Sequence, residues 1–395
     1  MPGGLVPPGR GAEPSRSTTP SGPIVQEAAG RAAPNRTYQD LLTSPSDESL
    51  FEHYAASRIA IVSVDGPARL IGDLGIHLSA QPSPDGRYLL VSTSHRPFSY
   101  VVPVGRFPQR IEIWDLDGRL VKRVTDRPLI EEMSIAFDAS VPGPRDATWR
   151  MDAPATVVWT EALDDGDPTR TAERRDRLVS LDAPFAGQPR SLLDADYRIN
   201  DIVWAGDALA LVSEGWWKTR RARMWAIAPA TAATKPRLVF DLSSEDRYTD
   251  PGRFVTVPGP LGTPVLLTTR DRKFAYLAGD GASPEGDRPF LDRIELATGK
   301  TTRLWRSQAP YYESVVTVLD ADGRQVITRR ESATEAPNYF LRDLRSGRST
   351  PLTEFKDPAP QFAGITRELI KYKRADGVEL SATLYLPAGY DRARG

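Results

Sequence analysis

The sequence contains no cysteine and only three histidines, His53, His77 and His95. The lack of cysteine excludes disulfide bonds, thiolate nucleophiles and metal sites ligated by cysteine. All three histidines lie in the first quarter of the chain. A histidine-rich metal centre and a histidine base near the C-terminus are therefore excluded, and we expect no metal and no cofactor.

Long apolar runs and net charge are also missing. No stretch approaches the roughly 18–20 apolar residues of a membrane span, and the N-terminus lacks the apolar core of a secretory signal. The chain has 51 basic and 52 acidic residues, so no net field would attract nucleic acid or an anionic membrane. We expect neither as a partner. The expected location is cytoplasmic if Met1 is the true start, and secreted or periplasmic if the N-terminus is truncated.

The residues that are abundant favour many short strands. The 35 prolines and 30 glycines separate short runs of valine, isoleucine, leucine, tryptophan and tyrosine, which is typical of an all-β chain. Residues 1–36 have almost no bulky apolar side chains and are expected to be a disordered Pro/Gly-rich linker. A short helix is expected over residues 38–54, because Ser44, Pro45 and Glu48 form a capping signal.

A strand–turn–strand motif recurs between Arg58 and Phe362. Its clearest copy runs from Ile111 through a turn at Gly118 to Leu120, and other copies begin near residues 58, 178, 224, 292 and 339. A compact apolar strand precedes every copy but the first, at residues 88–91, 156–159, 209–212, 265–268 and 326–328. An inner strand followed by an outer hairpin is the order of a propeller blade. The pattern predicts a β-propeller over residues 37–362 with about five to six blade units.

The C-terminal segment has a different pattern. Residues 368–373 and 379–387 alternate like two strands on either side of the turn Ala375-Asp376-Gly377. An Asp-Gly turn between two such runs predicts a hairpin.

Five long motifs stand out from this background: Phe51-Glu52-His53-Tyr54-Ala55, and the segments 95–108, 214–221, 281–293 and 330–339. Together with the C-terminal hairpin, they resemble the prolyl oligopeptidase clan of serine peptidases, and most closely its glutamyl endopeptidase branch. The resemblance covers about residues 37–391. It implies a propeller that covers the active site of a C-terminal α/β-hydrolase domain, with residues 363–395 as the first hairpin of that domain. It also implies that the first blades precede Met1, so that the chain holds part of an incomplete seven-bladed ring.

The catalytic residues of such a peptidase are missing from the sequence. The only approach to the nucleophile motif G-x-S-x-G is Gly281-Ala282-Ser283-Pro284-Glu285-Gly286, whose spacing is wrong and whose proline would obstruct the helix after a true nucleophile. No histidine follows His95, whereas the hydrolase order places the histidine last. We therefore predict no catalytic residue in this chain.

A group of cations is the candidate substrate-binding site. Lys218, Arg220 and Arg221 follow a Trp-Trp pair and could hold an acidic side chain, an interpretation favoured by the resemblance to glutamyl endopeptidases. The alternative is a solvated basic loop. Arg288 and Arg293 are further candidates, but pairing with their neighbours Asp287 and Asp292 is the simpler expectation.

Three other features favour structural interpretations. His95 could line the central cavity, but a hydrogen-bonded loop histidine is the better expectation. The Asp164-Asp165-Gly166-Asp167 segment lacks the spacing and the final glutamate of a calcium loop and is expected to be a polar turn. Five tryptophans at strand positions are expected to be blade core: Trp114, Trp159, Trp204, Trp225 and Trp305.

The preferred hypothesis is the substrate-gating propeller of a serine peptidase that cleaves peptides after glutamate. Its partner would be a peptide substrate bound together with the missing hydrolase domain, and the chain itself is expected to be inactive. The alternative is a stand-alone β-propeller that acts as a binding or scaffold protein. The hairpin over residues 368–387 argues against that alternative, because a free propeller has no use for the first strands of a hydrolase.

Overall fold

The computed structural model describes residues 38–231, 234–362 and 364–392, so the linker expected over residues 1–36 lies outside the described residues. The chain divides into two compact units. The first unit runs to Glu245 and takes in Thr256–Leu266, and the second holds Asp246–Val255 and continues from Leu267. No helix in the described part of the chain is long and apolar enough to cross a membrane.

Helix α1 spans Pro45–Ala55. Ser44 is its N-cap, and the Ser44 hydroxyl accepts a hydrogen bond from the N–H of Asp47 at 3.2 Å. Pro45 suits the first turn because the N–H that proline lacks has no partner there. The helix expected over residues 38–54 is therefore confirmed from residue 45 onward. Its predicted start was wrong, because Ser44 is the N-cap and the helix begins after it.

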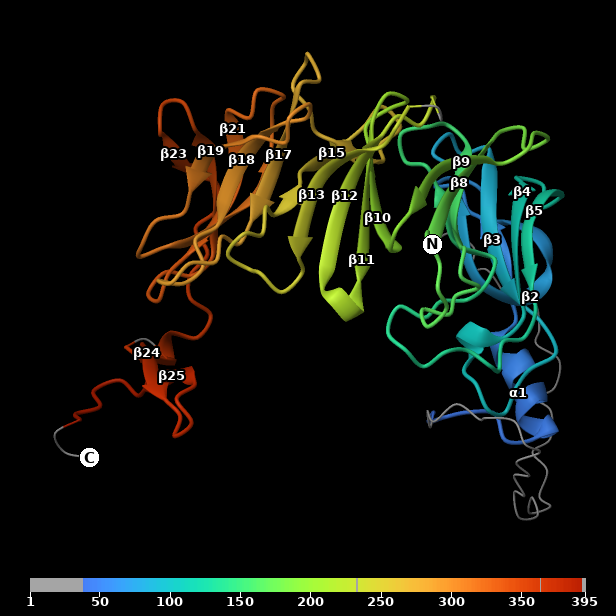
Figure 1. Cartoon of the computed structure of the whole chain (residues 1–395), viewed down its shortest axis with the longest axis horizontal. Helices are drawn as coiled ribbons and strands as arrows, with labels where there is room; N and C mark the ends of the chain where they lie inside the picture. Colours follow the sequence, from blue (N-terminus) through green and yellow to red (C-terminus); the bar gives the residue numbers. More distant parts are fainter. Residues whose placement is uncertain (1–37, 232–233, 363, 393–395) are drawn as a thin grey trace. The chain divides into compact units, whose positions relative to one another are not determined.

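The first unit contains three antiparallel sheets whose strands follow chain order (Figure 1). The first sheet consists of β1 (Ser57–Ile61), β2 (Arg69–Pro82), β3 (Tyr88–Ser94), β4 (Gln109–Asp115) and β5 (Leu120–Arg127). The second consists of β6 (Pro144–Trp149), β7 (Thr156–Ala162), β8 (Asp176–Asp182) and β9 (Arg190–Ala195). The third consists of β10 (Arg198–Trp204), β11 (Ala210–Trp216), β12 (Arg221–Ile227) and β13 (Arg237–Ser243). The short pair β15 (Thr256–Pro258) and β16 (Pro264–Leu266) also belongs to this unit.

The second unit contains two four-stranded sheets and a hairpin. The fourth sheet consists of β14 (Arg253–Phe254), β17 (Phe274–Gly279), β18 (Phe290–Glu295) and β19 (Thr301–Arg306). The fifth consists of β20 (Tyr312–Val318), β21 (Gln325–Glu331), β22 (Asn338–Asp343) and β23 (Ser349–Pro351). The hairpin, drawn in red in Figure 1, pairs β24 (Thr366–Lys373) with β25 (Glu379–Leu386), and Gly377 supplies the positive φ of 87° in its turn.

The prediction of an all-β chain built from blade-like sheets is confirmed. Five antiparallel sheets of four or five strands follow one another along the chain, in agreement with the five to six units expected. After the first copy, the predicted hairpin motifs are the last two strands of their sheets, such as β4 with β5 and β8 with β9. The predicted C-terminal hairpin is confirmed as well.

The expected order of strands within a blade was wrong in one respect. Four of the compact apolar strands are not the first strands of their sheets, because β2, β6, β10 and β20 precede β3, β7, β11 and β21. Each of these preceding strands has a register shift, for example between Ile199 and Asp201 in β10. A bulge breaks the alternation of inward and outward side chains, so the period of two that marks a strand is lost there.

The strand expected at residues 265–268 was also misplaced. Residues Pro264–Leu266 form β16, which pairs with β15. The strand that pairs with β18 is β17, which contains Ala275, Ala278 and Gly279. These small residues have low β propensity, so the segment gives a weak strand signal in the sequence.

The cores of the first unit lie between successive sheets. One cluster joins Leu90 and Ile113 of the first sheet to Trp149 and Val157 of the second. Another joins Val158 and Leu193 of the second sheet to Trp204, Val212 and Ile227 of the third. The second sheet therefore packs against both the first and the third sheet, as a blade of a propeller packs between its neighbours.

Candidate functional site

The predicted basic loop is the connection between β11 and β12. A 3₁₀ turn at Trp217–Thr219 follows β11, and Arg220 then adopts a left-handed conformation with φ of 54° before β12 begins. The N–H of Trp217 donates a hydrogen bond to the Asp138 carboxylate at 2.7 Å. The turn is thereby attached to the segment between the first and second sheets.

An exposed aromatic surface accompanies the cations of this loop. The rings of Phe137 and Trp217 stack with centroids 4.2 Å apart, and both side chains are exposed. The guanidinium carbon of Arg220 lies 3.4 Å from the centroid of the Trp217 ring. Arg220 also forms an ion pair with Glu245 at 3.0 Å. Because the Glu245 side chain is 68% exposed, an incoming carboxylate can compete for Arg220 at little cost.

The other two predicted cations differ in their pairing. Arg221 is bidentate to Asp241, with Nη2 at 2.7 Å from Oδ2. Lys218 is exposed and forms no ion pair with any of the residues that the structure describes. Lys218 is thus the one of the three loop cations that can bind a carboxylate without first losing a partner among the described residues.

Arg288 belongs to the second unit, whereas the three loop cations belong to the first. Its backbone N–H donates to the Gly281 carbonyl at 2.9 Å. The pairs expected for Arg288 and Arg293 were wrong, because the aspartates beside them have other partners: Asp287 pairs with Arg247 and Asp292 with Arg303. Arg293 instead lies over the ring of Phe274 at 4.6 Å. Strand pairing between β18 and β19 places Asp292 opposite Arg303, which sequence neighbours cannot reveal.

The pairing of Arg221 predicts a pH dependence. The hydrogen bond from Arg221 holds the pKa of Asp241 below its ordinary value of 3.8. A lowered pKa in the folded state means that this contribution to stability is complete above pH 3.8 and is lost as the pH falls through the lower folded value. Asp241→Asn is expected to lower the free energy of unfolding at pH 7 by up to about 1 kcal/mol, measured by urea unfolding. The difference in the free energy of unfolding between the parent and Asp241→Asn should be smaller at pH 3 than at pH 7. An equal difference at both pH values would show that the Arg221–Asp241 pair does not stabilise the fold.

His95 is a hydrogen-bonded loop histidine, as expected. Its Nε2 lies 2.9 Å from Oδ1 of Asp126, and its Nδ1 lies 2.7 Å from the Arg96 carbonyl. Ser283, the residue nearest to a nucleophile motif in the sequence, lies in a turn where its hydroxyl donates to the Gly286 carbonyl at 2.6 Å. Neither residue contacts a catalytic partner among the described residues.

The Asp164–Asp167 segment is a turn, as expected. The N–H of Asp167 donates to the Asp164 carbonyl at 3.1 Å, and no cluster of potential metal ligands occurs among the residues that the structure describes. The Asp164 carboxylate is buried and accepts two hydrogen bonds from Arg198 at 2.8 Å.

A buried ion cluster lies beneath the basic loop. Asp164 and Asp176 bind Arg198, and Asp176 also accepts a hydrogen bond from Arg145. Arg175 pairs with Asp164 at 3.0 Å, and its guanidinium lies 4.7 Å from the centroid of Trp216, which begins the loop. The cluster joins the second sheet to the third and so fixes the strand from which the loop starts.

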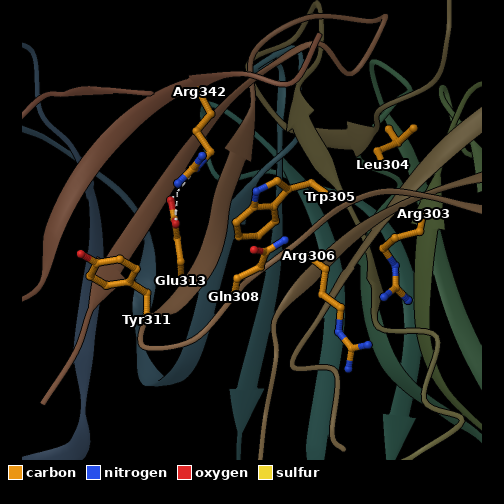
Figure 2. A pocket seen from close by; sticks show the side chains of 8 residues that line it. All are labelled: Arg303, Leu304, Trp305, Arg306, Gln308, Tyr311, Glu313 and Arg342. Atoms are coloured by element: carbon orange, nitrogen blue, oxygen red, sulfur yellow. Dashed lines mark hydrogen bonds and ion pairs between the residues drawn. The ribbon is translucent and has the colours of Figure 1, made fainter. Parts of the chain in front are cut away.

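Figure 2 shows a cavity of about 520 Å³ in the second unit. Trp305 lies on one side, and Tyr311 with the Glu313–Arg342 pair lies on the other. Arg342 binds Glu313 through two hydrogen bonds of 2.7 Å, so this charge is already compensated. Trp305 is only partly buried, in contrast to the core position expected for it, whereas Trp114, Trp159 and Trp204 are buried as expected.

Sequence reasoning identified the basic loop but missed the cavities. Trp305 and Tyr311 flank an Ala-Pro turn, and their distance in sequence gives no sign that they face each other with Arg342, which is about 30 residues further on. The only sequence signal is a Tyr-Tyr-Glu run at the start of a strand, which is also typical of a half-buried strand.

Comparison with known proteins identifies the chain's relatives. No protein-family model matches the sequence. The rice (Oryza sativa subsp. japonica) protein named "Probable glutamyl endopeptidase, chloroplastic" is 40% identical over 98% of this chain, and the Arabidopsis thaliana protein of the same name is 39% identical over 98%. The chain spans 43% and 42% of the lengths of these relatives.

A solved structure supports the fold. A protein of Bacteroides ovatus provisionally described as a dipeptidyl aminopeptidase IV superposes on 86% of this chain and 52% of its own, with a TM-score of 0.51 and 13% identity. The structural similarity, at 13% identity, supports the fold alone. The 40% sequence identity over nearly the whole chain indicates common ancestry. The chain is therefore related, over nearly its whole length, to proteins named as glutamyl endopeptidases.

Proposed function

We propose that this chain is the substrate-gating propeller portion of a serine-type peptidase that cleaves peptides after glutamate. The observation that carries the proposal is the 40% identity to a relative named as a glutamyl endopeptidase, which extends over 98% of the chain. The serine, aspartate and histidine of the reaction would belong to the part of such a protein that this sequence does not contain.

The basic loop gives the proposal a chemical basis. A peptide with a glutamate side chain presents a carboxylate, which binds best to a cation that no other carboxylate already neutralises. Lys218 meets this condition, and the exposed Glu245 leaves Arg220 open to exchange. The exposed ring of Trp217 offers an apolar surface beside them. Arg288 is the fourth residue that we propose for binding the substrate carboxylate.

The division of the chain into a linker at 1–36, a propeller at 37–362 and a hydrolase start at 363–395 is part of the same proposal. A two-stranded hairpin is at best marginally stable alone. The hairpin of β24 and β25 exposes Leu369 and Tyr385 at 55% and 62%. These apolar side chains suit a hairpin that packs against further residues of a hydrolase domain.

The test extends the reading frame beyond codon 395 in the source DNA. We expect an in-frame continuation with G-x-S-x-G, aspartate and histidine. The longer protein should react with a fluorophosphonate probe and cleave a quenched peptide with glutamate faster than its glutamine counterpart. A longer protein that does neither would refute the proposed function, and labelling of the purified 395-residue chain would refute the absence of an activated serine.

In that longer protein, Lys218→Ala is expected to lower kcat/KM for the glutamate peptide about tenfold, because a charge-assisted hydrogen bond to the substrate is lost. Arg220→Ala should have a similar effect and Lys235→Ala none, since Lys235 is an exposed lysine elsewhere in the same unit. Steady-state assays of both peptides test this. Equal rates for Lys218→Ala and the parent would show that the loop does not select glutamate.

A further inference from the structure

A second cavity, of about 590 Å³, lies within the first unit. We call it the arginine cavity. Residues of the first sheet line one part of it, and the segment before β6 and the start of β6 line the rest. The polar residues on which its chemistry depends are Gln109, Arg127, Ser140, Arg145 and Asp146. Its volume is in the range of about 300–1,000 Å³ that small-molecule sites occupy.

Arg127 has no acidic partner in direct contact among the described residues. Its Nη2 donates to the side-chain carbonyl of Gln109 at 2.7 Å and to the Gly105 carbonyl at 3.1 Å, both of which are neutral. Its Nε is buried and has no hydrogen-bond partner among the described residues. Burial lowers the pKa of Arg127, and the charge of Asp146 opposes this only in part. The cation is thus partly desolvated, and no carboxylate among the described residues is in contact to compensate it.

Arg145 is nine-tenths buried, at 8% exposure, and also retains an unused donor. Its Nη2 binds Asp176, and its Nε lies 3.2 Å from the Asp146 carboxylate. Its Nη1 is buried without a partner among the described residues, and so is the hydroxyl of Ser140. The Asp146 carboxylate compensates the charge of Arg145 only weakly, because the Asp146 side chain is 74% exposed and its charge is largely solvated.

Three buried polar groups around one cavity therefore lack partners among the described residues. Nearly all buried polar groups in folded proteins are hydrogen-bonded, because each one that is not costs free energy. A carboxylate offers two oxygens with about four acceptor positions, and two guanidinium groups with a hydroxyl are its natural donors. We propose that the arginine cavity binds a carboxylate group through Arg127 and Arg145, with Ser140 as an additional donor.

This site is independent of the proposed peptidase function, because the cavity is contained in the present chain and needs no hydrolytic residue. The carboxylate can come from a small organic acid or from an acidic side chain of a peptide. Both sources present the same group to the arginines, and they differ in whether an amide backbone accompanies it. Matched ligands separate the two sources.

The test is isothermal titration calorimetry of the 395-residue chain in a buffer without carboxylate. The ligands are glutarate, N-acetylglutamate amide and the neutral N-acetylglutamine amide. Binding of glutarate and of the glutamate derivative would assign the site to the carboxylate alone, and binding of only the glutamate derivative would assign it to a peptide. Binding of neither, or equal binding of the glutamine derivative, would overturn the proposal and leave water as the partner of the buried donors.

Variants locate the binding. Arg127→Gln should weaken binding about tenfold or more, since its charge-assisted hydrogen bonds are lost. Ser140→Ala should weaken it by a smaller factor without lowering the midpoint of urea unfolding, because its hydroxyl has no partner among the described residues. Arg110→Gln is the matched control, since Arg110 follows Gln109 on β4 and binds Asp126 instead. Unchanged affinity in Arg127→Gln and Ser140→Ala, or equal losses in Arg110→Gln, would overturn the assignment.

Discussion

Asp176→Asn is expected to lower the free energy of unfolding by about 3–5 kcal/mol. Asp176 is fully buried, and its carboxylate accepts hydrogen bonds from Arg145, from Arg198 at 2.9 Å and from the N–H of Ile199 at 2.8 Å. The substitution leaves Asp164, bound to Arg175 and Arg198, as the remaining buried carboxylate of the cluster, and it leaves Arg145 with only the exposed Asp146 as an acidic partner. An uncompensated buried guanidinium is far more costly than the pair it replaces.

Urea unfolding followed by tryptophan fluorescence measures the effect. Asp165→Asn is the control, because Asp165 lies in the adjoining turn, is 73% exposed and pairs with the exposed Arg170. Asp165→Asn should lower the free energy of unfolding by no more than about 0.5 kcal/mol. A loss below about 1 kcal/mol for Asp176→Asn would show that the cluster is hydrated or rearranges, and that the second and third sheets do not depend on it.

The regular parts of the fold could be predicted from the sequence because their signals are local. The turn at Gly118, the Asp-Gly turn before Val378 and the alternation along β4 and β12 depend only on neighbouring residues. The strands β2, β6, β10 and β20 could not be predicted because their bulges interrupt that alternation. In β6, for example, Arg145 pairs with Thr160 while Thr148 already pairs with Val158.

The candidate sites divide in the same way. Lys218 and Trp217 adjoin each other in the sequence, so the amino-acid order alone reveals a cation beside an aromatic ring. The pairing of Arg221 with Asp241 depends on the register between β12 and β13, and that of Asp176 with Arg198 depends on contact between two sheets. Arg127 and Ser140 come together only through the path of the loop between β5 and β6. Sequence patterns carry no information on such contacts.

Trp149→Ala is expected to lower the free energy of unfolding by about 3–5 kcal/mol. Trp149 ends β6, is 2% exposed and packs in the cluster shared by the first and second sheets. Its indole N–H also donates to the Gln81 carbonyl at 2.9 Å, which links β6 to β2. The substitution opens a cavity between two sheets that have no strand pairing with each other, so little of it can collapse.

Trp149→Phe separates packing from hydrogen bonding. Phenylalanine keeps most of the apolar contact but leaves the Gln81 carbonyl without its donor, which should cost about 1–3 kcal/mol. Leu120→Ala on β5 is the control, since Leu120 is 52% exposed and its truncation should change stability by no more than about 0.5 kcal/mol. If Trp149→Ala also cost only that much in urea unfolding, the first two sheets would be held together by strand register and loops and not by a shared core. These two sheets would then lack the face-to-face packing that makes a propeller blade depend on its neighbour.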